Sequence, residues 1–407
     1  MLTEKFLIKV SLVLAVLFHF IFFFGLYGPF NRIFIWNFLL AWSSVMILSF
    51  IYFVTNWKSN VKDYVTILFY KSFLIIILIS LLRAIYHVNG INGFFWLLFD
   101  SYTGLSFASV LFFIIGCNAR YFALLNKVLA IYCFTAFVFA VIYINSFELA
   151  VFVLMPIFYV ILTFPLQSSW KRLFTLVISA TIIVVSLTHR AGMMRIIISY
   201  LIVVIYYVIL KVRLNKNLLY LITFCILMLP FYFLYRGSTG YNVFQEVLGE
   251  TTEDYSEQNL RIDTRTFLYT EVLGDLQLEN SLIFGKGIDG GYASEAFQTS
   301  SRQAVEVGFL QIMLKTGLVG TIIYFVLLFS AIFKALGKSN SIYLKAMGIL
   351  LASHALMFFI ENVLAFDLLN IVIWLVIGMC HSKELLRLSD SEIRSLFVKG
   401  KIEKVQT

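Results

Sequence analysis

Three basic residues fall within seven positions between two long apolar segments: His189, Arg190 and Arg195. Guanidinium groups bind phosphates and carboxylates through paired, charge-assisted hydrogen bonds. The chemistry offered by this cluster is therefore the binding of an anion. The alternative is that each side chain extends from a helix end into the aqueous interface, as arginine often does. The orientation of the chain, derived below, favours the functional interpretation.

A second basic pair lies further along the chain. Arg261 and Arg265 are four positions apart, so on a helix they would share one face and could jointly bind a dianion such as a diphosphate. The alternative is a salt bridge from these arginines to the neighbouring Asp263 or Glu257. The local sequence alone leaves both interpretations open.

These candidates belong to a chain dominated by apolar residues. Of its 407 residues, 61% are hydrophobic and 13% are charged, whereas about a quarter of the residues in a soluble domain are charged. The apolar residues occur in blocks of about 20, the length that crosses a hydrocarbon core of about 30 Å. We therefore predict an all-α integral membrane protein with about twelve transmembrane helices. The predicted spans are residues 8–27, 33–54, 64–83, 102–118, 127–145, 149–166, 172–188, 193–211, 217–235, 316–334, 342–360 and 363–381.

The basic residues orient these spans. If the N-terminus is cytoplasmic, every inner loop is basic, whereas the short outer loops contain only Arg32, Arg83 and Arg190 as basic residues. This agrees with the positive-inside rule. It places both termini in the cytoplasm and explains the net charge of +9 without a nucleic-acid partner. The four cysteines show no C-x-x-C spacing, so neither a disulfide nor a zinc site is expected.

One outer loop differs from the rest of the chain. Residues 236–305 contain 11 acidic and 5 basic residues, and connections of this length are usually functional or disordered. Hydrophobic periodicity predicts a helix at 267–278 in this loop. The apolar segment that follows is too long for one span. We therefore predict a helix at the membrane surface over 305–316, with Gly317 and Gly320 at the start of the next span.

The chain thus divides into four parts, and the last of them contains Ser389 and Glu392 at the spacing of a capping box. This tail is predicted to form a short amphipathic helix attracted to anionic headgroups, or else to be solvated. The parts are spans one to nine at 1–235, the large outer loop at 236–305, a surface helix and spans ten to twelve at 306–381, and a cytoplasmic tail at 382–407.

Several short motifs, taken in order, resemble the superfamily of bacterial O-antigen polymerases and ligases. An arginine ends a span, a second arginine in a large outer loop is followed by an aromatic residue, a G-x-G string comes next, and an aromatic residue then precedes two glycines. The residues at these positions are Arg190, Arg265, Tyr269, Gly285, Gly287, Phe309, Gly317 and Gly320. The chain departs from the pattern at the family's His-Asn pair, which is replaced by Glu306 and Val307.

The resemblance implies a polytopic glycosyltransferase of the GT-C type in the bacterial inner membrane, with undecaprenyl-diphosphate-linked oligosaccharide as its substrate at the periplasmic face. Arg190 and Arg265 would be catalytic, stabilising the diphosphate as it leaves. Glu306, at the position of the family's histidine, would be the base, or it would cap the following helix. No Asp-x-Asp string offers a metal site, so no metal or cofactor is expected. The residues expected to bind substrate are Arg261, His189, Arg195, Arg302 and Tyr269.

Three functions remain open. The missing histidine, which is associated with ligases, favours a polymerase that joins lipid-linked repeat units. A ligase would share the chemistry and transfer the glycan to lipid A core. A flippase for lipid-linked oligosaccharides would need no large outer loop and should show related halves, and neither expectation fits the sequence. The resemblance also implies the lipid bilayer, a chain-length regulator and a flippase of the same pathway as partners.

Overall fold

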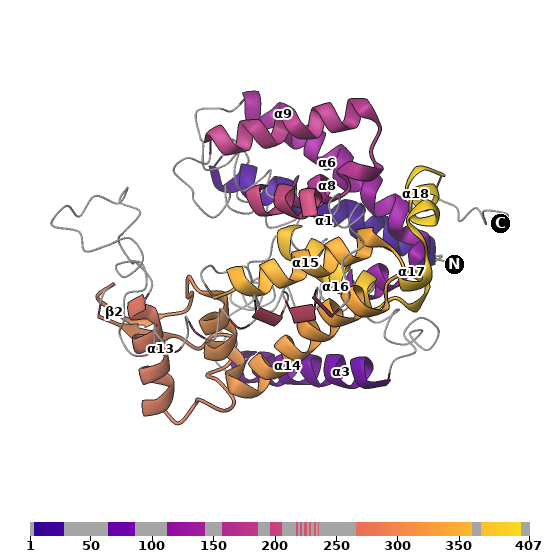
Figure 1. The fold of residues 1–407 in the computed structure, drawn as a ribbon. Coiled ribbons are helices and arrows are strands. Elements are labelled where there is room, and N and C mark those ends of the chain that lie inside the picture. Colours follow the sequence, from indigo (N-terminus) through magenta and orange to yellow (C-terminus); the bar gives the residue numbers. More distant parts are fainter. Residues whose placement is uncertain are drawn as a thin grey trace.

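The protein is predominantly helical, and its helices lie side by side in a bundle with a small mixed region at one end (Figure 1). The computed structural model describes residues 4–27, 64–85, 112–142, 157–185, 196–205, 266–295, 297–359 and 368–399, together with single positions between 217 and 235.

The longer helices in the first half of the described chain overlap predicted spans, whereas the shorter elements cover only parts of spans or lie between them. These elements are α1 (Glu4–Tyr27), α3 (Tyr64–Ile85), η2 (Ala119–Tyr121), α6 (Phe122–Ile142), α8 (Ile157–Leu162), η3 (Phe164–Leu166) and α9 (Ser169–Val185). The predicted span at 33–54 lies outside the described residues. Because several other predicted spans are described only in part, the number of spans stays a prediction.

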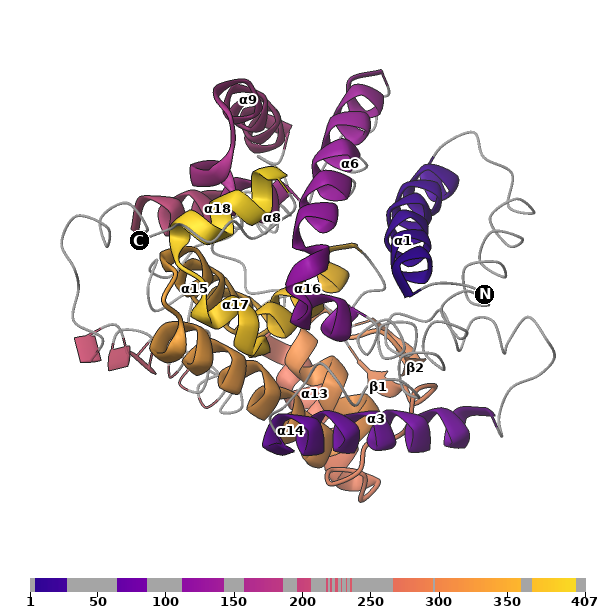
Figure 2. The same ribbon diagram turned by 90° about the vertical axis from the view of Figure 1, so that its right-hand side faces the viewer.

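The C-terminal bundle consists of three antiparallel helices, α14 (Gly308–Lys338), α15 (Ile342–Met357) and α16 (Leu368–His381). Helix α3 runs beside α14 in both views (Figures 1 and 2). Among the described residues, α14 is the helix that is long and apolar enough to cross a membrane, and shorter apolar helices accompany it. These features are consistent with an all-α membrane protein.

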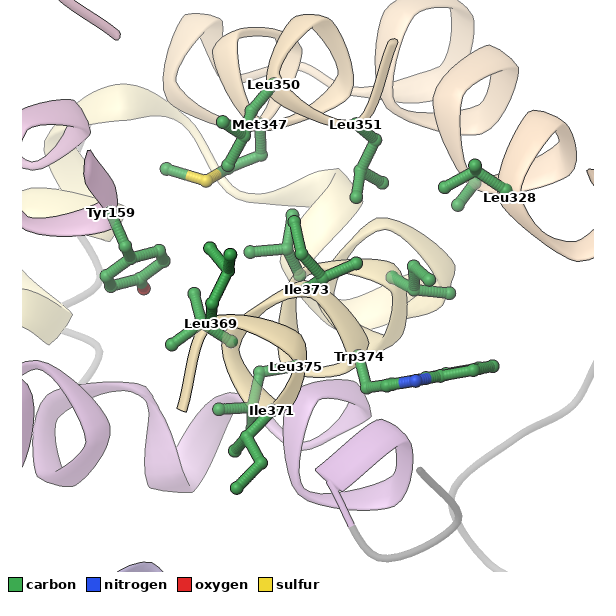
Figure 3. Close-up of a cluster of buried hydrophobic side chains, with 14 of the residues drawn as sticks. Tyr159, Leu328, Met347, Leu350, Leu351, Leu369, Ile371, Ile373, Trp374 and Leu375 are labelled. Atoms are coloured by element: carbon green, nitrogen blue, oxygen red, sulfur yellow. The ribbon is translucent and has the colours of Figure 1, made fainter. Parts of the chain in front are cut away.

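Large apolar side chains fill the centre of this bundle. Trp374 and Ile373 of α16 are buried, as are Met347 of α15, Leu328 of α14 and Tyr159 of α8 (Figure 3). Between helices in a membrane such side chains stabilise the fold through close van der Waals packing, because lipid tails are as apolar as the side chains themselves. The core therefore joins α8, which is distant in sequence, to the three C-terminal helices.

A small region, here called the cap, covers one end of the bundle and comprises residues 266–307. It contains α13 (Thr266–Leu278) and an antiparallel hairpin of β1 (Tyr292–Ser294) and β2 (Thr299–Arg302). The predicted helix at 267–278 is confirmed by α13. The hairpin was not predicted, because its short strands, rich in serine and threonine, lack a run of alternating apolar residues.

The opposite end of the bundle carries the tail, residues 382–399, which forms α17 (Lys383–Arg387) and α18 (Asp390–Lys399). The first residues of α1 lie at this same end (Figure 1). The predicted capping box is present. The Ser389 backbone N–H donates to Glu392 over 2.8 Å, and the Glu392 N–H donates back to the Ser389 hydroxyl over 3.4 Å. Helix α18 packs on α6 through Phe397 and Phe122.

Candidate functional site

Of the eight predicted site residues, the structure describes three, Glu306, Arg302 and Tyr269, and all three lie in the cap. The other five lie outside the described residues: His189, Arg190, Arg195, Arg261 and Arg265. The arrangement of the two predicted arginine clusters therefore stays a prediction. The cap itself can be described atom by atom.

The cap is joined to the bundle by an interruption in α14. The backbone of Gly317 adopts φ 68°, which breaks the helix after its first nine residues. The N–H groups of Leu318 and Val319 donate to the carbonyls of Leu282 and Ile283, over 2.9 and 3.2 Å. A regular helix would instead direct these N–H groups to the carbonyls of residues 314 and 315.

The two carbonyls released by this break are also satisfied by the cap. The N–H of Lys286 donates to Leu314 over 2.8 Å, and the N–H of Gly287 donates to Lys315 over 3.1 Å. Two helical hydrogen bonds are thus replaced by four bonds between α14 and residues 282–287. Buried backbone groups that lose their helical partners require others, because an unpaired buried group is costly. We call this connection the joint.

Glycine is required on both sides of the joint. A Cβ atom on Gly317 would lie 2.3 Å from the carbonyl oxygen of Ile283, and one on Gly285 would lie 2.6 Å from the backbone of residues 315–317. Both glycines also have positive φ, 68° and 69°, which other residues rarely adopt. The G-x-G motif and Gly317 therefore form one structural unit. The expected division between a helix over 305–316 and the following span is found at Gly317.

A buried lysine strengthens the joint from inside. Lys315 has 0% of its surface exposed, and its ammonium donates to the carbonyls of Ile288 over 2.6 Å and Gly290 over 2.9 Å. A buried charge is costly unless hydrogen bonds satisfy it. These bonds fix the segment after the G-x-G motif against α14. Sequence reasoning missed Lys315, although a lone lysine in an apolar stretch next to a predicted span is itself a signal.

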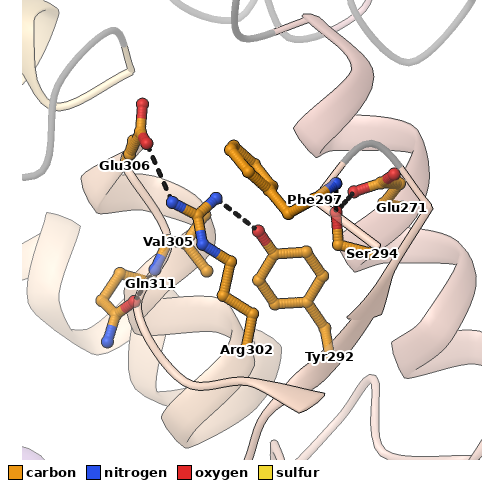
Figure 4. A network of polar contacts seen from close by, with 8 residues as sticks. All are labelled: Glu271, Tyr292, Ser294, Phe297, Arg302, Val305, Glu306 and Gln311. Carbon is orange, nitrogen blue, oxygen red and sulfur yellow. Dashed lines mark hydrogen bonds and ion pairs between the residues drawn. The ribbon is translucent and has the colours of Figure 1, made fainter. Parts of the chain in front are cut away.

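A network of polar and aromatic groups surrounds Arg302 (Figure 4). Its guanidinium donates to Glu306 over 2.9 Å and to the Tyr292 hydroxyl over 3.2 Å, and it lies 3.6 Å above the ring centre of Phe297. Burial lowers the pKa of Arg302, but the bonds to Glu306 and Tyr292 outweigh this effect and the pKa rises. Burial has the opposite effect on the Tyr292 hydroxyl, whose pKa it raises. The guanidinium therefore remains charged and held in one place.

Glu306 lies between this network and the start of α14. Its side chain is 43% exposed, so the carboxylate reaches solvent while paired with Arg302. Val307, whose apolar side chain makes no cap hydrogen bond, is the N-cap of α14, and the capping role considered for Glu306 stays a prediction. Gln311 holds the connection instead, since its side-chain oxygen accepts from the Val305 N–H over 2.6 Å.

Two further contacts fix the cap on the bundle. Tyr269 of α13 is buried, and its hydroxyl donates to the Phe359 carbonyl over 2.6 Å. The Phe309 N–H, at the start of α14, donates to the Phe358 carbonyl over 3.0 Å. The turn after α15 thus anchors both α13 and α14. The Tyr269 hydroxyl is used in this tether, and the expected contact of Tyr269 with substrate stays a prediction.

The lysine of the G-x-G string is also engaged within the cap. Lys286 forms ion pairs with Asp275 and, over 2.7 Å, with Glu279. Burial lowers the pKa of Lys286, but its hydrogen bonds and ion pairs with these two carboxylates raise the pKa by more, so the net shift is upward. Its charge is balanced by α13. Arg302 and Glu306 therefore remain the cap's partly exposed ionic pair with an adjacent aromatic face.

The described site offers a fixed guanidinium, an aromatic ring and a carboxylate open to solvent. A carboxylate can accept a proton from a hydroxyl group, and an aromatic ring can pack against the apolar face of a sugar. Within the described ranges, no group of three or more metal-binding side chains comes together. The fold and this site define a helical membrane-type protein whose polar cap is built around an interrupted helix.

Comparison with known proteins places part of the chain in a family context. Residues 174–325 match the family model described as O-antigen ligase. This match confirms the resemblance to the O-antigen ligase and polymerase superfamily, whose members are membrane-associated glycosyl-transfer enzymes. It covers the predicted arginine clusters, the cap and the joint. No curated protein and no solved structure matches the chain.

Proposed function

We propose that the protein polymerises lipid-linked oligosaccharide repeat units into O-antigen or a related surface polysaccharide, by glycosyl transfer at the periplasmic face of a bacterial inner membrane. The observation that carries this proposal is the family match over residues 174–325. The cap supports it, because those motifs of the matched segment that the structure describes contact one another and form one connected structure.

In this proposal the donor is a glycan on undecaprenyl diphosphate. A hydroxyl oxygen of the acceptor attacks the anomeric carbon, and the bond from that carbon to the diphosphate breaks. The electron pair leaves with the lipid diphosphate, whose growing negative charge is stabilised by Arg190 and Arg265 through charge-assisted hydrogen bonds. Arg261, His189 and Arg195 bind the same anion.

Glu306 takes the proton from the acceptor hydroxyl. Its carboxylate is exposed enough to meet an acceptor and is oriented by Arg302, and a base must first be within reach of the proton it removes. Arg302 and Phe297 form the adjacent surface, where the ring offers a face for the acceptor sugar. Arg302 is thus a positioning residue for Glu306 as well as a candidate contact of the substrate.

A ligase is the second candidate, favoured by the description of the matched family. The polymerase is preferred because Glu306 and Val307 replace the His-Asn pair of the resemblance. The two functions differ in the acceptor, which is a second lipid-linked repeat for the polymerase and lipid A core for the ligase. A chain-length regulator and a flippase of the same pathway are proposed as partners.

A deletion strain complemented with variants tests the function through its glycan ladder on a gel. A deletion that leaves a single repeat on lipid A core indicates a polymerase, whereas loss of every attached repeat indicates a ligase or flippase. Arg190→Ala and Arg265→Ala should insert normally and abolish long chains. Normal ladders from both variants would rule out the assignment of these arginines.

A further inference from the structure

The surface of the cap carries four apolar side chains close together in sequence, here called the apolar ridge: Leu278, Leu282, Ile283 and Phe284. They are 85%, 36%, 55% and 62% exposed. Single exposed apolar residues are common, but several large ones within seven positions suggest an interaction surface. The ridge begins at Leu278, the last residue of α13, and its other members belong to the segment that forms the joint.

The position of the ridge relative to α14 is fixed by hydrogen bonds. The carbonyls of Leu282 and Ile283 accept from Leu318 and Val319, the first residues of α14 after its break. The ridge therefore lies level with the start of the apolar part of α14, and it cannot move away without breaking the joint.

The exposed side of α14 beyond the break identifies the surroundings at that level. Its exposed large apolar residues are Leu318, Ile322 and Phe333, which follow one face of the helix, and the exposed Lys338 lies at its far end. A helix face in contact with water would carry polar residues, whereas a wholly apolar exposed face on a helix long enough to span a membrane indicates hydrocarbon. The backbone of the ridge is hydrogen-bonded to Leu318, the first residue of this apolar face.

We propose that the apolar ridge is inserted into the membrane leaflet on the side of the cap, where it contacts lipid acyl chains. Residues 278–284 would then not be part of a loop that lies wholly in water, as the sequence predicted for 236–305. After residue 287 the chain would return through the membrane–water interface to β1. This proposal does not rest on the proposed reaction, because it needs only α14 as a membrane-spanning helix.

Charge on the adjoining part of the cap fits this placement. Asp275 lies on α13, and Glu279 lies four positions on, just after the helix ends. Both carboxylates are paired with Lys286. This reduces the repulsion that two free carboxylates would experience near anionic headgroups. The exposed polar residue Gln277 precedes the ridge and Asn280 lies within it, which is compatible with the headgroup level.

Spin labels on the full-length protein in lipid nanodiscs test the insertion. In a Cys225→Ser background, which removes the exposed cysteine and leaves Cys117, Cys133 and Cys380 buried, a label is attached at Phe284→Cys. The matched control is Thr299→Cys, an exposed position in β2. Collision rates with oxygen, which concentrates in lipid, and with a water-soluble nickel complex are measured for both.

The ratio of oxygen to nickel collisions should be several-fold higher at position 284 than at position 299. Equal nickel access at the two positions would overturn the proposal, since the ridge would then lie in water. Low access of both reagents at 284, with dipolar broadening between labels, would also overturn it in favour of contact with a second copy. If Phe284→Cys does not fold, Leu278→Cys gives the same comparison at the most exposed position of the ridge.

Discussion

The two ends of the C-terminal bundle are closed in different ways. At the tail, capping side chains supply the missing partners of helix ends, as when Asp390 accepts from the hydroxyl of Ser341, over 2.6 Å, and from the Tyr343 N–H, over 3.2 Å. At the cap, the backbone of α14 itself is interrupted and completed by a distant segment. The tail needs only common capping residues, whereas the cap depends on glycines at two fixed points.

This difference predicts unequal tolerance to substitution. The cap end has little room for adjustment, because each backbone bond of the joint depends on the others. The tail end uses separate local bonds, each worth about 1 kcal/mol. Substitutions in the joint should therefore destabilise the protein strongly and disturb the site. Substitutions in the tail should have only local effects.

The largest effect is expected from Gly317→Ala. Positive φ costs a residue with a Cβ on the order of 1–3 kcal/mol, and the new atom would meet the Ile283 carbonyl. We expect a lower thermal midpoint in detergent and loss of long glycan. The matched control is Gly274→Ala in α13, where a Cβ would meet nothing within 4 Å. A Gly317→Ala protein as stable as this control would contradict the joint.

Lys315→Met should have the next largest effect. Methionine fills a similar space but donates nothing, so the carbonyls of Ile288 and Gly290 lose a donor, at a cost of about 1–3 kcal/mol for unsatisfied buried groups. Thermal unfolding of the purified protein measures the loss. Lys338→Met, at the exposed C-terminal end of the same helix, is the control and should change the midpoint little. Equal midpoints for the two variants would show that the buried ammonium is not needed.

Alkaline pH should weaken the cap more than the tail. The pKa values of Tyr292 and Lys286 are raised above their ordinary values of 10.0 and 10.5. Groups with a raised pKa in the folded state contribute stability that is complete below the ordinary pKa and is lost as pH rises through the folded value. Thermal midpoints between about pH 8 and 11 should fall less steeply for Tyr292→Phe than for the wild type. Identical slopes would contradict the contribution of Tyr292.

The smallest effect is expected at the tail, from Ser389→Ala. Loss of this N-cap should cost about 1 kcal/mol, and glycan length should not change. The pKa of Glu392 is lowered by its hydrogen bonds with Ser389, so the wild-type box contributes stability above the ordinary pKa of 4.5 that is lost as pH falls through the folded value. Hydrogen exchange in α18 measures this opening. A loss of long glycan in this variant would contradict the prediction that damage at the tail stays local.

The sequence predicted the tail better than the cap for a physical reason. The Ser389 and Glu392 box acts over three residues, so spacing alone identifies it. The break at Gly317 was expected from the length of the apolar segment, and the glycines of the G-x-G string were noted. That these glycines meet could not be deduced, because the contact joins segments about thirty residues apart through backbone atoms that every residue type shares.

The site was predicted in part for a similar reason. Glu306 and Arg302 were identified by charge and position, and they form an ion pair. Their support by Tyr292 and Phe297 depends on the hairpin, whose short strands carry little sequence signal. The turn at Phe358 and Phe359, which anchors the cap, acts through carbonyl oxygens and leaves no trace in residue type.

The most direct test of the proposed function uses the purified protein in proteoliposomes supplied with lipid-linked repeat units and no lipid A core. Product length is measured by gel and mass spectrometry for the wild type, Glu306→Gln and Glu384→Gln, an exposed carboxylate at the tail. The wild type and Glu384→Gln should lengthen the glycan at equal rates. Glu306→Gln, which can still accept from Arg302, should be slower by about 10²-fold or more, as for loss of a general base. A Glu306→Gln protein that lengthens chains at the wild-type rate would contradict a catalytic cap.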